Sequence, residues 1–151
     1  MSLGTVVLNT SPGKMTLPVA RKKALVVDDS STILHAICAL LEHHEIVEIA
    51  GRVESGPEAI DAVIELKPDV VLMDADMPGM SGLRTALLLS QLQPGTTVIL
   101  MSMDTSLQFR AACAGCGASA VIYKPKFLRE LSALLHRPLR GRRFAGRIGR
   151  I

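Results

Sequence analysis

The chain has 151 residues, enough for one domain with a buried core but too few for two domains of ordinary size. Hydrophobic residues make up 48% and charged residues 21%, a globular balance, and no apolar run is long enough to cross a bilayer. The net charge of +3 comes from the C-terminal tail, because residues 1–136 carry 11 basic against 14 acidic side chains.

Residues 1–21 mix Thr, Ser, Pro and Gly without periodicity, and we expect a flexible leader there. The segment lacks the basic start and long apolar centre of a secretion signal.

The three cysteines, Cys38, Cys113 and Cys116, are an odd number in apolar or small-residue surroundings. This pattern argues against a disulfide framework and favours the reducing cytoplasm.

Short apolar runs alternate with amphipathic segments from Lys23 onward. The runs predict five strands, at 24–27, 45–53, 70–73, 97–101 and 120–123. Apolar residues at helical spacing predict a helix that Ser30 and Ser31 can cap and a second helix that starts with SGPEAIDAVIELK. Further helices are predicted at about 83–92, 105–114 and 127–135. Because apolar strands alternate with amphipathic helices, we expect a parallel sheet covered on both faces, with the alternating second strand nearer an edge.

Polar side chains follow four of these strands, at the point where each strand ends. They are Asp28 and Asp29, Asp74 and Asp76, Ser102 and Asp104, and Lys124. Ligands of open parallel sheets bind outside the carboxyl ends of the strands, where these side chains could converge. Clustered carboxylates repel one another unless a cation intervenes, and oxygen ligands of high charge favour Mg²⁺.

Such a group of side chains suits phosphoryl transfer, which depends mostly on positioning and on neutralising charge. Asp74 would be the nucleophile that forms an acyl phosphate, with the ammonium of Lys124 and the hydroxyl of Ser102 beside it. For any one of these acids alone, a helix cap or a turn is about as good an explanation. The hypothesis therefore depends on the whole set.

Four separated motifs, VVDDS, VVLMDADMPGMSG, VILMS and GASAVIYKP, occur in this order between residues 22 and 136. Together they resemble the receiver domain of two-component response regulators. The resemblance implies a flavodoxin-like (βα)5 fold of the α/β class, a doubly wound five-stranded parallel sheet with strand order 2-1-3-4-5. It places the receiver domain at 22–136, after the leader at 1–21 and before a basic tail or linker at 137–151.

The resemblance also implies roles for individual residues. Asp74 is the phosphoacceptor, and the carboxylates of Asp28, Asp29 and Asp74 hold Mg²⁺ together with the main-chain carbonyl of Asp76. Ser102 is the hydroxyl that moves toward the phosphoryl group, and Lys124 pairs with that group. The bond between Lys124 and Pro125 is usually cis in this family.

The implied function is that of a cytoplasmic signalling protein rather than an enzyme acting on other molecules. A histidine kinase or phosphotransfer protein donates the phosphoryl group, and a separate output protein reads the change. The chain would be a monomer or a phosphorylation-linked dimer, with no membrane partner. Nucleic acid would bind only through the arginine-rich tail, which a solvated linker also explains, or through an output domain lost by truncation.

Two positions depart from the family pattern. Val121 stands where family members usually carry an aromatic residue that turns inward on phosphorylation, which puts the coupling to output in doubt. Met103 stands where a small residue is common, and its bulk should slow phosphorylation by small phosphodonors. These departures leave open a receiver-like interaction module that no longer takes phosphate.

Two other interpretations of the motifs carry less weight. DADMPG also resembles the nucleophile motif of haloacid dehalogenase-type phosphatases, but that family has the motif on its first strand and its second acidic pair downstream. CAGC at 113–116 matches a thiol redox pattern. These cysteines fall near the C-terminal end of a predicted helix, however, and not at an N-terminus where thiols gain reactivity, so buried packing is the better interpretation.

Overall fold

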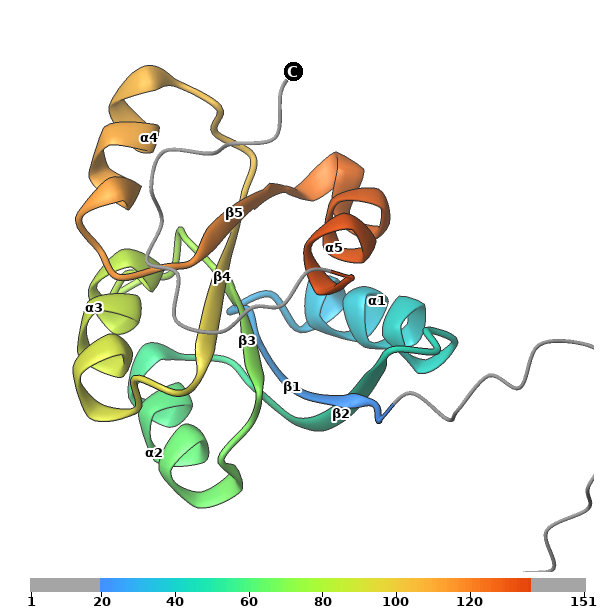
Figure 1. Ribbon diagram of the computed structural model, residues 1–151. Helices are drawn as coiled ribbons and strands as arrows, with labels where there is room; N and C mark the ends of the chain where they lie inside the picture. The colour runs from blue at the N-terminus through green and yellow to red at the C-terminus, as the bar shows by residue number, and fades with distance from the viewer. Residues whose placement is uncertain (1–19, 137–151) are drawn as a thin grey trace, which may run out of the picture.

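The computed structural model describes residues 20–136, so residues 1–19 and 137–151, which hold most of the predicted leader and the whole basic tail, lie outside the described part. Strands and helices alternate along it (Figure 1). The strands are β1 (Lys22–Val27), β2 (Val47–Val53), β3 (Val70–Asp74), β4 (Thr97–Ser102) and β5 (Ala120–Tyr123). The helices are α1 (Ser31–Glu42), α2 (Gly56–Leu66), α3 (Gly82–Leu92), α4 (Leu107–Ala114) and α5 (Phe127–Leu135), with a 3₁₀ turn, η1 (Lys124–Lys126), before α5.

The five strands form one sheet in the order β2-β1-β3-β4-β5, and every neighbouring pair is parallel. The predicted strand order and fold class are confirmed, and β2 is an edge strand as its alternating pattern indicated. The chain order reverses at β1, between β2 and β3, so the carboxyl ends of β1 and β3 lie side by side. This is the position at which doubly wound sheets bind their ligands.

Helices cover both faces of the sheet (Figure 1). α1 and α5 pack on one face, where Leu34 and Leu131 belong to a core cluster with strand residues such as Val26. α2, α3 and α4 pack on the other face, around strand residues such as Met73 and Leu100. Truncating a buried leucine to alanine in such a core typically costs about 2 to 5 kcal/mol. The sheet is therefore a firm support for the side chains at its carboxyl edge.

Serine residues begin four of the helices. Ser30, Ser55, Ser81 and Ser106 are the N-caps of α1 to α4, and each hydroxyl accepts a backbone N–H from the first turn. This capping satisfies a donor that would otherwise lack a partner and stabilises each helix by about 1 kcal/mol. The helices therefore start close to the strand ends that precede them.

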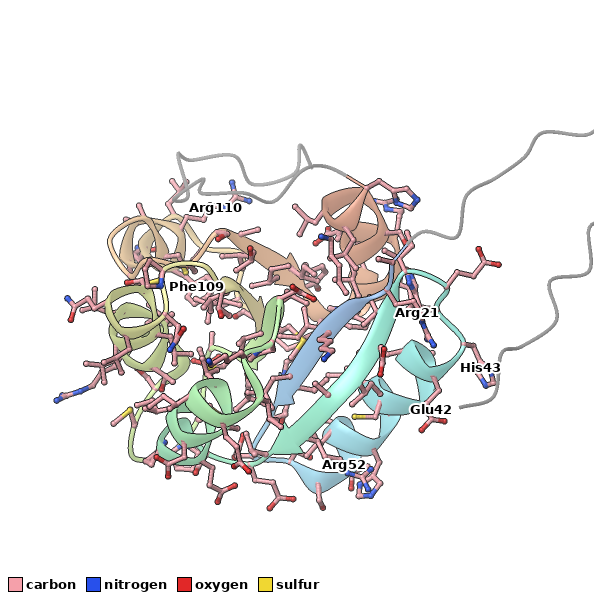
Figure 2. All side chains as sticks on the ribbon, turned by 60° about the horizontal axis from the view of Figure 1, so that its bottom comes forward. Arg21, Glu42, His43, Arg52, Phe109 and Arg110 are labelled. Atoms are coloured by element: carbon pink, nitrogen blue, oxygen red, sulfur yellow. The ribbon has the colours of Figure 1, made fainter. Side chains whose placement is uncertain are left out.

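The start of the sheet is held by Arg21, which is labelled in Figure 2. Its guanidinium Nη2 donates to the carbonyl oxygens of His44 and Val47, so it joins the residue before β1 to the loop before β2 and to the first residue of β2. No helix among residues 20–136 is long and apolar enough to span a membrane.

The structure differs from the expectations in several local respects. β1 begins at Lys22 and β2 at Val47, and β4 includes Ser102. Asp74 is the last residue of β3 rather than the first residue after it. α4 begins at Leu107 and not at 105, because Asp104 accepts the N–H of Ser106 and shapes a turn before the cap. The cis bond expected at Pro125 is wrong for this structure, since residues 20–136 contain no cis peptide bond and Pro125 lies in the first turn of η1, where a trans proline fits.

Candidate functional site

Three carboxylates converge at the carboxyl edge of the sheet. β1 and β3 are neighbours with Val27 opposite Met73, so the residues that follow, Asp28 and Asp74, also lie side by side. Asp28, Asp29 and Asp74 each offer an oxygen within 4.8 Å of the others. Asp28 and Asp74 are buried, whereas Asp29 is exposed. The donor set consists of oxygen atoms with high negative charge, which fits a hard divalent cation such as Mg²⁺.

Lys124 reaches this cluster from the end of β5. Its ammonium Nζ lies 3.0 Å from Oδ2 of Asp28 and 3.2 Å from Oδ1 of Asp74, with 17% of the lysine side chain exposed. Lys124 is 96 residues from Asp28 in the sequence, so only the folded sheet brings the two charges together. The ammonium neutralises part of the acidic charge and stands where it can contact an anion bound at Asp74.

Burial and neighbouring charges shift the pKa values of Asp74 and Lys124. Burial raises the pKa of Asp74 above its ordinary value, although the N–H of Asp76 and the charge of Lys124 act in the opposite direction. Burial alone would lower the pKa of Lys124, but its hydrogen bond to Asp28 and the charge of Asp74 outweigh burial and raise that pKa. The ammonium therefore stays charged throughout the neutral range.

The two oxygens of Asp74 have different surroundings. Oδ1 accepts the backbone N–H of Asp76 at 3.2 Å and contacts Lys124. None of the hydrogen bonds or ion pairs found among residues 20–136 involves Oδ2. In Asp28, by contrast, Oδ1 accepts the N–H of Ser30 and Oδ2 contacts Lys124, so both oxygens are engaged. Oδ2 of Asp74 is thus the carboxylate oxygen that is available for reaction.

Ser102 stands at the end of β4, the strand beside β3. Its side chain is buried, and its Oγ accepts the backbone N–H of Asp104 at 2.9 Å. The hydroxyl hydrogen remains able to donate to a neighbouring anion. Ser102 and Asp104 also shape the loop that leads into α4, so a movement of this hydroxyl is connected to the start of that helix.

The remaining predicted residues lie around this centre. The side chain of Asp76 is exposed and does not belong to the cluster of three carboxylates, so only its backbone is placed toward Asp74. Met103 has 62% of its surface exposed beside Ser102. Val121 packs partly buried against the core on the α4 side, together with Phe109 of α4, which is labelled in Figure 2.

Gly82 is a residue of this site that sequence reasoning missed. A Cβ atom at Gly82 would lie 2.1 Å from the carbonyl oxygen of Asp74 and 2.8 Å from Cα of Ala75. The first turn of α3 therefore approaches the end of β3 at a distance that only glycine permits. The clustering of two glycines directly after DADMP was the available signal.

The CAGC cysteines take no part in the site. Cys113 and Cys116 are buried free thiols, as the packing interpretation predicted. Burial, with smaller contributions from Cys116 and nearby acids, raises the pKa of Cys113 to about 12. A thiol in this state is a poor nucleophile and a poor metal ligand at neutral pH.

Comparison with known proteins identifies the family. The profile of the response regulator receiver domain matches residues 24–136. The response regulator GacA of Pseudomonas aeruginosa is 31% identical over 122 residues, which are 81% of this chain and 57% of that protein. A protein-glutamate methylesterase/protein-glutamine glutaminase of Pseudomonas putida is 36% identical over 110 residues, 73% of this chain and 30% of that protein. The chain thus spans about half the length, or less, of these curated relatives.

Solved structures agree on the fold. The isolated receiver domain of RcsB from Salmonella enterica serovar Typhimurium superposes with a TM-score of 0.70 at 22% identity, covering 83% of this chain and 93% of that one. The response regulator domain of CheB from Thermotoga maritima gives a TM-score of 0.69 at 25% identity, covering 79% and 99%. These comparisons do not favour the haloacid dehalogenase alternative. The chain belongs to the response regulator receiver domain family.

Proposed function

We propose that Asp74 accepts a phosphoryl group from a phosphohistidine of a histidine kinase or phosphotransfer protein, and that the phosphorylated domain signals to an output protein. The observation that supports this most strongly is the position of Lys124, whose ammonium contacts both Asp28 and Asp74. The ammonium of the half-buried Lys124 offsets part of the negative charge of Asp28 and Asp74. An anionic phosphoryl group can then approach an oxygen that would otherwise repel it.

In the proposed reaction, Oδ2 of Asp74 attacks phosphorus, and the bond from phosphorus to the donor's imidazole nitrogen breaks. The electron pair of that bond stays on the imidazole, and the product is an acyl phosphate on Asp74. Lys124 holds the neighbouring oxygen, Oδ1, and can donate to a phosphoryl oxygen. The N–H of Asp76 also binds Oδ1 and fixes the orientation of the carboxylate before the attack.

Asp28, Asp29 and Asp74 would hold Mg²⁺ by their carboxylates, with the main-chain carbonyl of Asp76 as a further ligand. When bound, Mg²⁺ neutralises these carboxylates and the oxygens of the incoming phosphoryl group. The protein part of the site supplies the positions of the acids, and these are fixed by the neighbouring strands β1 and β3.

The signal would leave the site through Ser102. When Ser102 turns its hydroxyl toward a phosphoryl group on Asp74, the loop that Ser102 and Asp104 shape must follow, and with it the start of α4. We propose that an output protein reads the altered surface of α4, β5 and α5, and that the domain catalyses only its own phosphorylation and dephosphorylation. Its free buried cysteines suit the cytoplasm.

The proposal is tested by incubating the protein with acetyl phosphate and MgCl₂ and then measuring intact masses. Wild-type protein should gain one phosphoryl group, and Asp74→Asn should gain none. Asp61→Asn, which removes an exposed acid from α2, is the matched control and should behave as wild type. Equal phosphorylation of wild type and Asp74→Asn would show that another residue is modified.

The arginine-rich tail supports a second candidate function. Residues 137–151 carry six arginines and no acid, so they could bind nucleic acid by releasing counterions from its phosphates. Binding that weakens with salt and is lost on deleting residues 138–151 would support this function. Absence of DNA binding by both forms would exclude it.

A further inference from the structure

The end of strand β5 is tied to helix α5 by one side chain. Tyr123, the last residue of β5, donates its backbone N–H to the carboxylate Oε2 of Glu130 at 2.9 Å. Glu130 lies seven residues later, in the first turn of α5, and is partly buried. Within the described residues 20–136, β5 is an edge strand that pairs with β4 alone (Figure 1). Its end therefore has less support than the ends of the inner strands.

This tie stands where the usual capping contacts are missing. η1 and α5 both lack a side-chain hydrogen bond at their N-caps, whereas α1 to α4 each have one from a serine. α5 itself is firmly anchored, because Phe127, Leu131 and Leu135 are buried against the sheet. Glu130 thus projects from a fixed helix to the backbone of a short edge strand.

The residue that follows Tyr123 is Lys124, whose ammonium reaches Asp28 and Asp74. A lysine side chain has four rotatable bonds, so its ammonium stays at one place only if the backbone that carries it is also fixed. A carboxylate that accepts an N–H makes one of the stronger hydrogen bonds in proteins. Glu130 therefore restrains the peptide from which Lys124 extends.

We propose that Glu130 is a positioning residue for phosphoryl transfer: through the N–H of Tyr123 it holds the end of β5 so that Lys124 meets Asp74. The expected effect of Glu130 on the phosphorylation rate rests on the proposed function, whereas its expected effect on the Tyr123 amide does not. Glu130 acts through the main chain, since its carboxylate accepts the N–H of Tyr123 and the ion pairs of Lys124 are with Asp28 and Asp74. It touches no reacting atom.

Three variants test the proposal. Glu130→Ala removes the acceptor, and Glu130→Gln keeps an acceptor oxygen without the charge. Glu58→Ala is the matched control, because Glu58 also stands in the first turn of a helix and accepts a loop N–H, that of Glu54, but it does not lead to Lys124. For each variant we would measure hydrogen exchange of the Tyr123 amide by NMR, the initial rate of phosphorylation by acetyl phosphate with MgCl₂, and stability in urea.

We expect Glu130→Ala to speed exchange at Tyr123 and to slow phosphorylation by about tenfold each, the effect of losing one charged hydrogen bond. Glu130→Gln should restore most of both, and Glu58→Ala should change neither although it removes a similar contact. Faster exchange in Glu130→Ala with an unchanged phosphorylation rate would overturn the proposal, and so would unchanged exchange. If the wild-type protein itself is not phosphorylated, the proposed function fails. If Glu58→Ala is phosphorylated as slowly as Glu130→Ala, the specific role of Glu130 is overturned instead.

Discussion

Replacing Lys124 by methionine should destabilise the magnesium-free protein. The ammonium makes contacts of 3.0 and 3.2 Å with acids whose side chains are 1% and 7% exposed. Breaking a fully buried ion pair costs about 3 to 5 kcal/mol, whereas an exposed pair contributes about 0.2 to 1 kcal/mol. Because Lys124 is 17% exposed and Asp74 can relieve repulsion by taking up a proton, we expect a loss of about 2 to 3 kcal/mol.

Urea unfolding at neutral pH with EDTA measures this loss. Lys126→Met is the matched control, since Lys126 is exposed two residues further along, and it should stay within about 0.5 kcal/mol of wild type. Adding MgCl₂ should restore part of the stability of Lys124→Met, because a cation again separates the carboxylates. A Lys124→Met protein as stable as wild type without magnesium would refute the view that this ammonium offsets the repulsion between Asp28 and Asp74.

Four further predictions concern single residues. Because burial raises the pKa of Asp74, its ionisation costs stability, so magnesium-free Asp74→Asn should be more stable than wild type at neutral pH. The gain should vanish when the pH of the urea titration falls below 3.8, the ordinary pKa of an aspartate, because Asp74 is then protonated in both the folded and the unfolded protein. A gain in stability that does not depend on pH would contradict this. Gly82→Ala should lose about 1 to 3 kcal/mol of stability in urea and most of its phosphorylation, because the added Cβ would meet the carbonyl oxygen of Asp74. Wild-type values of both would disprove the close approach. Met103→Ala should be phosphorylated faster by acetyl phosphate than wild type, whereas equal rates would remove the crowding argument. Native Cys113, with a pKa raised to about 12, should react far more slowly with a thiol reagent at neutral pH than in urea, and equal rates would show that it is accessible.

The sequence predicted the sheet and its polar edge because each depends on a regular pattern. Apolar runs ending in Asp28, Asp74 and Ser102 mark strand ends, and an alternating βα pattern brings all such ends to one side of the sheet. The cap of the first helix was also visible, because Ser30, one of the two serines predicted as possible caps, is the N-cap of α1. These features are local in sequence, so local physical rules describe them.

Features that depend on distances between separate elements were not predictable. The sequence predicted the ammonium of Lys124 beside Asp74, but no pattern showed that it also contacts Asp28, because that contact depends on the length of β5 and on the turn after it. The approach of Gly82 to Asp74 depends on the angle at which α3 leaves the sheet. The trans bond at Pro125 also differs from the family expectation, and Pro125 lies in the first turn of the 3₁₀ segment that begins at Lys124.

The position of the phosphoryl group on the chain decides whether Asp74 is the phosphoacceptor. Borohydride reduces an acyl phosphate on an aspartate to homoserine, so protein treated with acetyl phosphate and MgCl₂ can be reduced, digested and sequenced by mass spectrometry. We predict homoserine at position 74 and nowhere else. Homoserine at position 28, 29 or 76 with Asp74 intact would contradict the assignment of Asp74 as the phosphoacceptor.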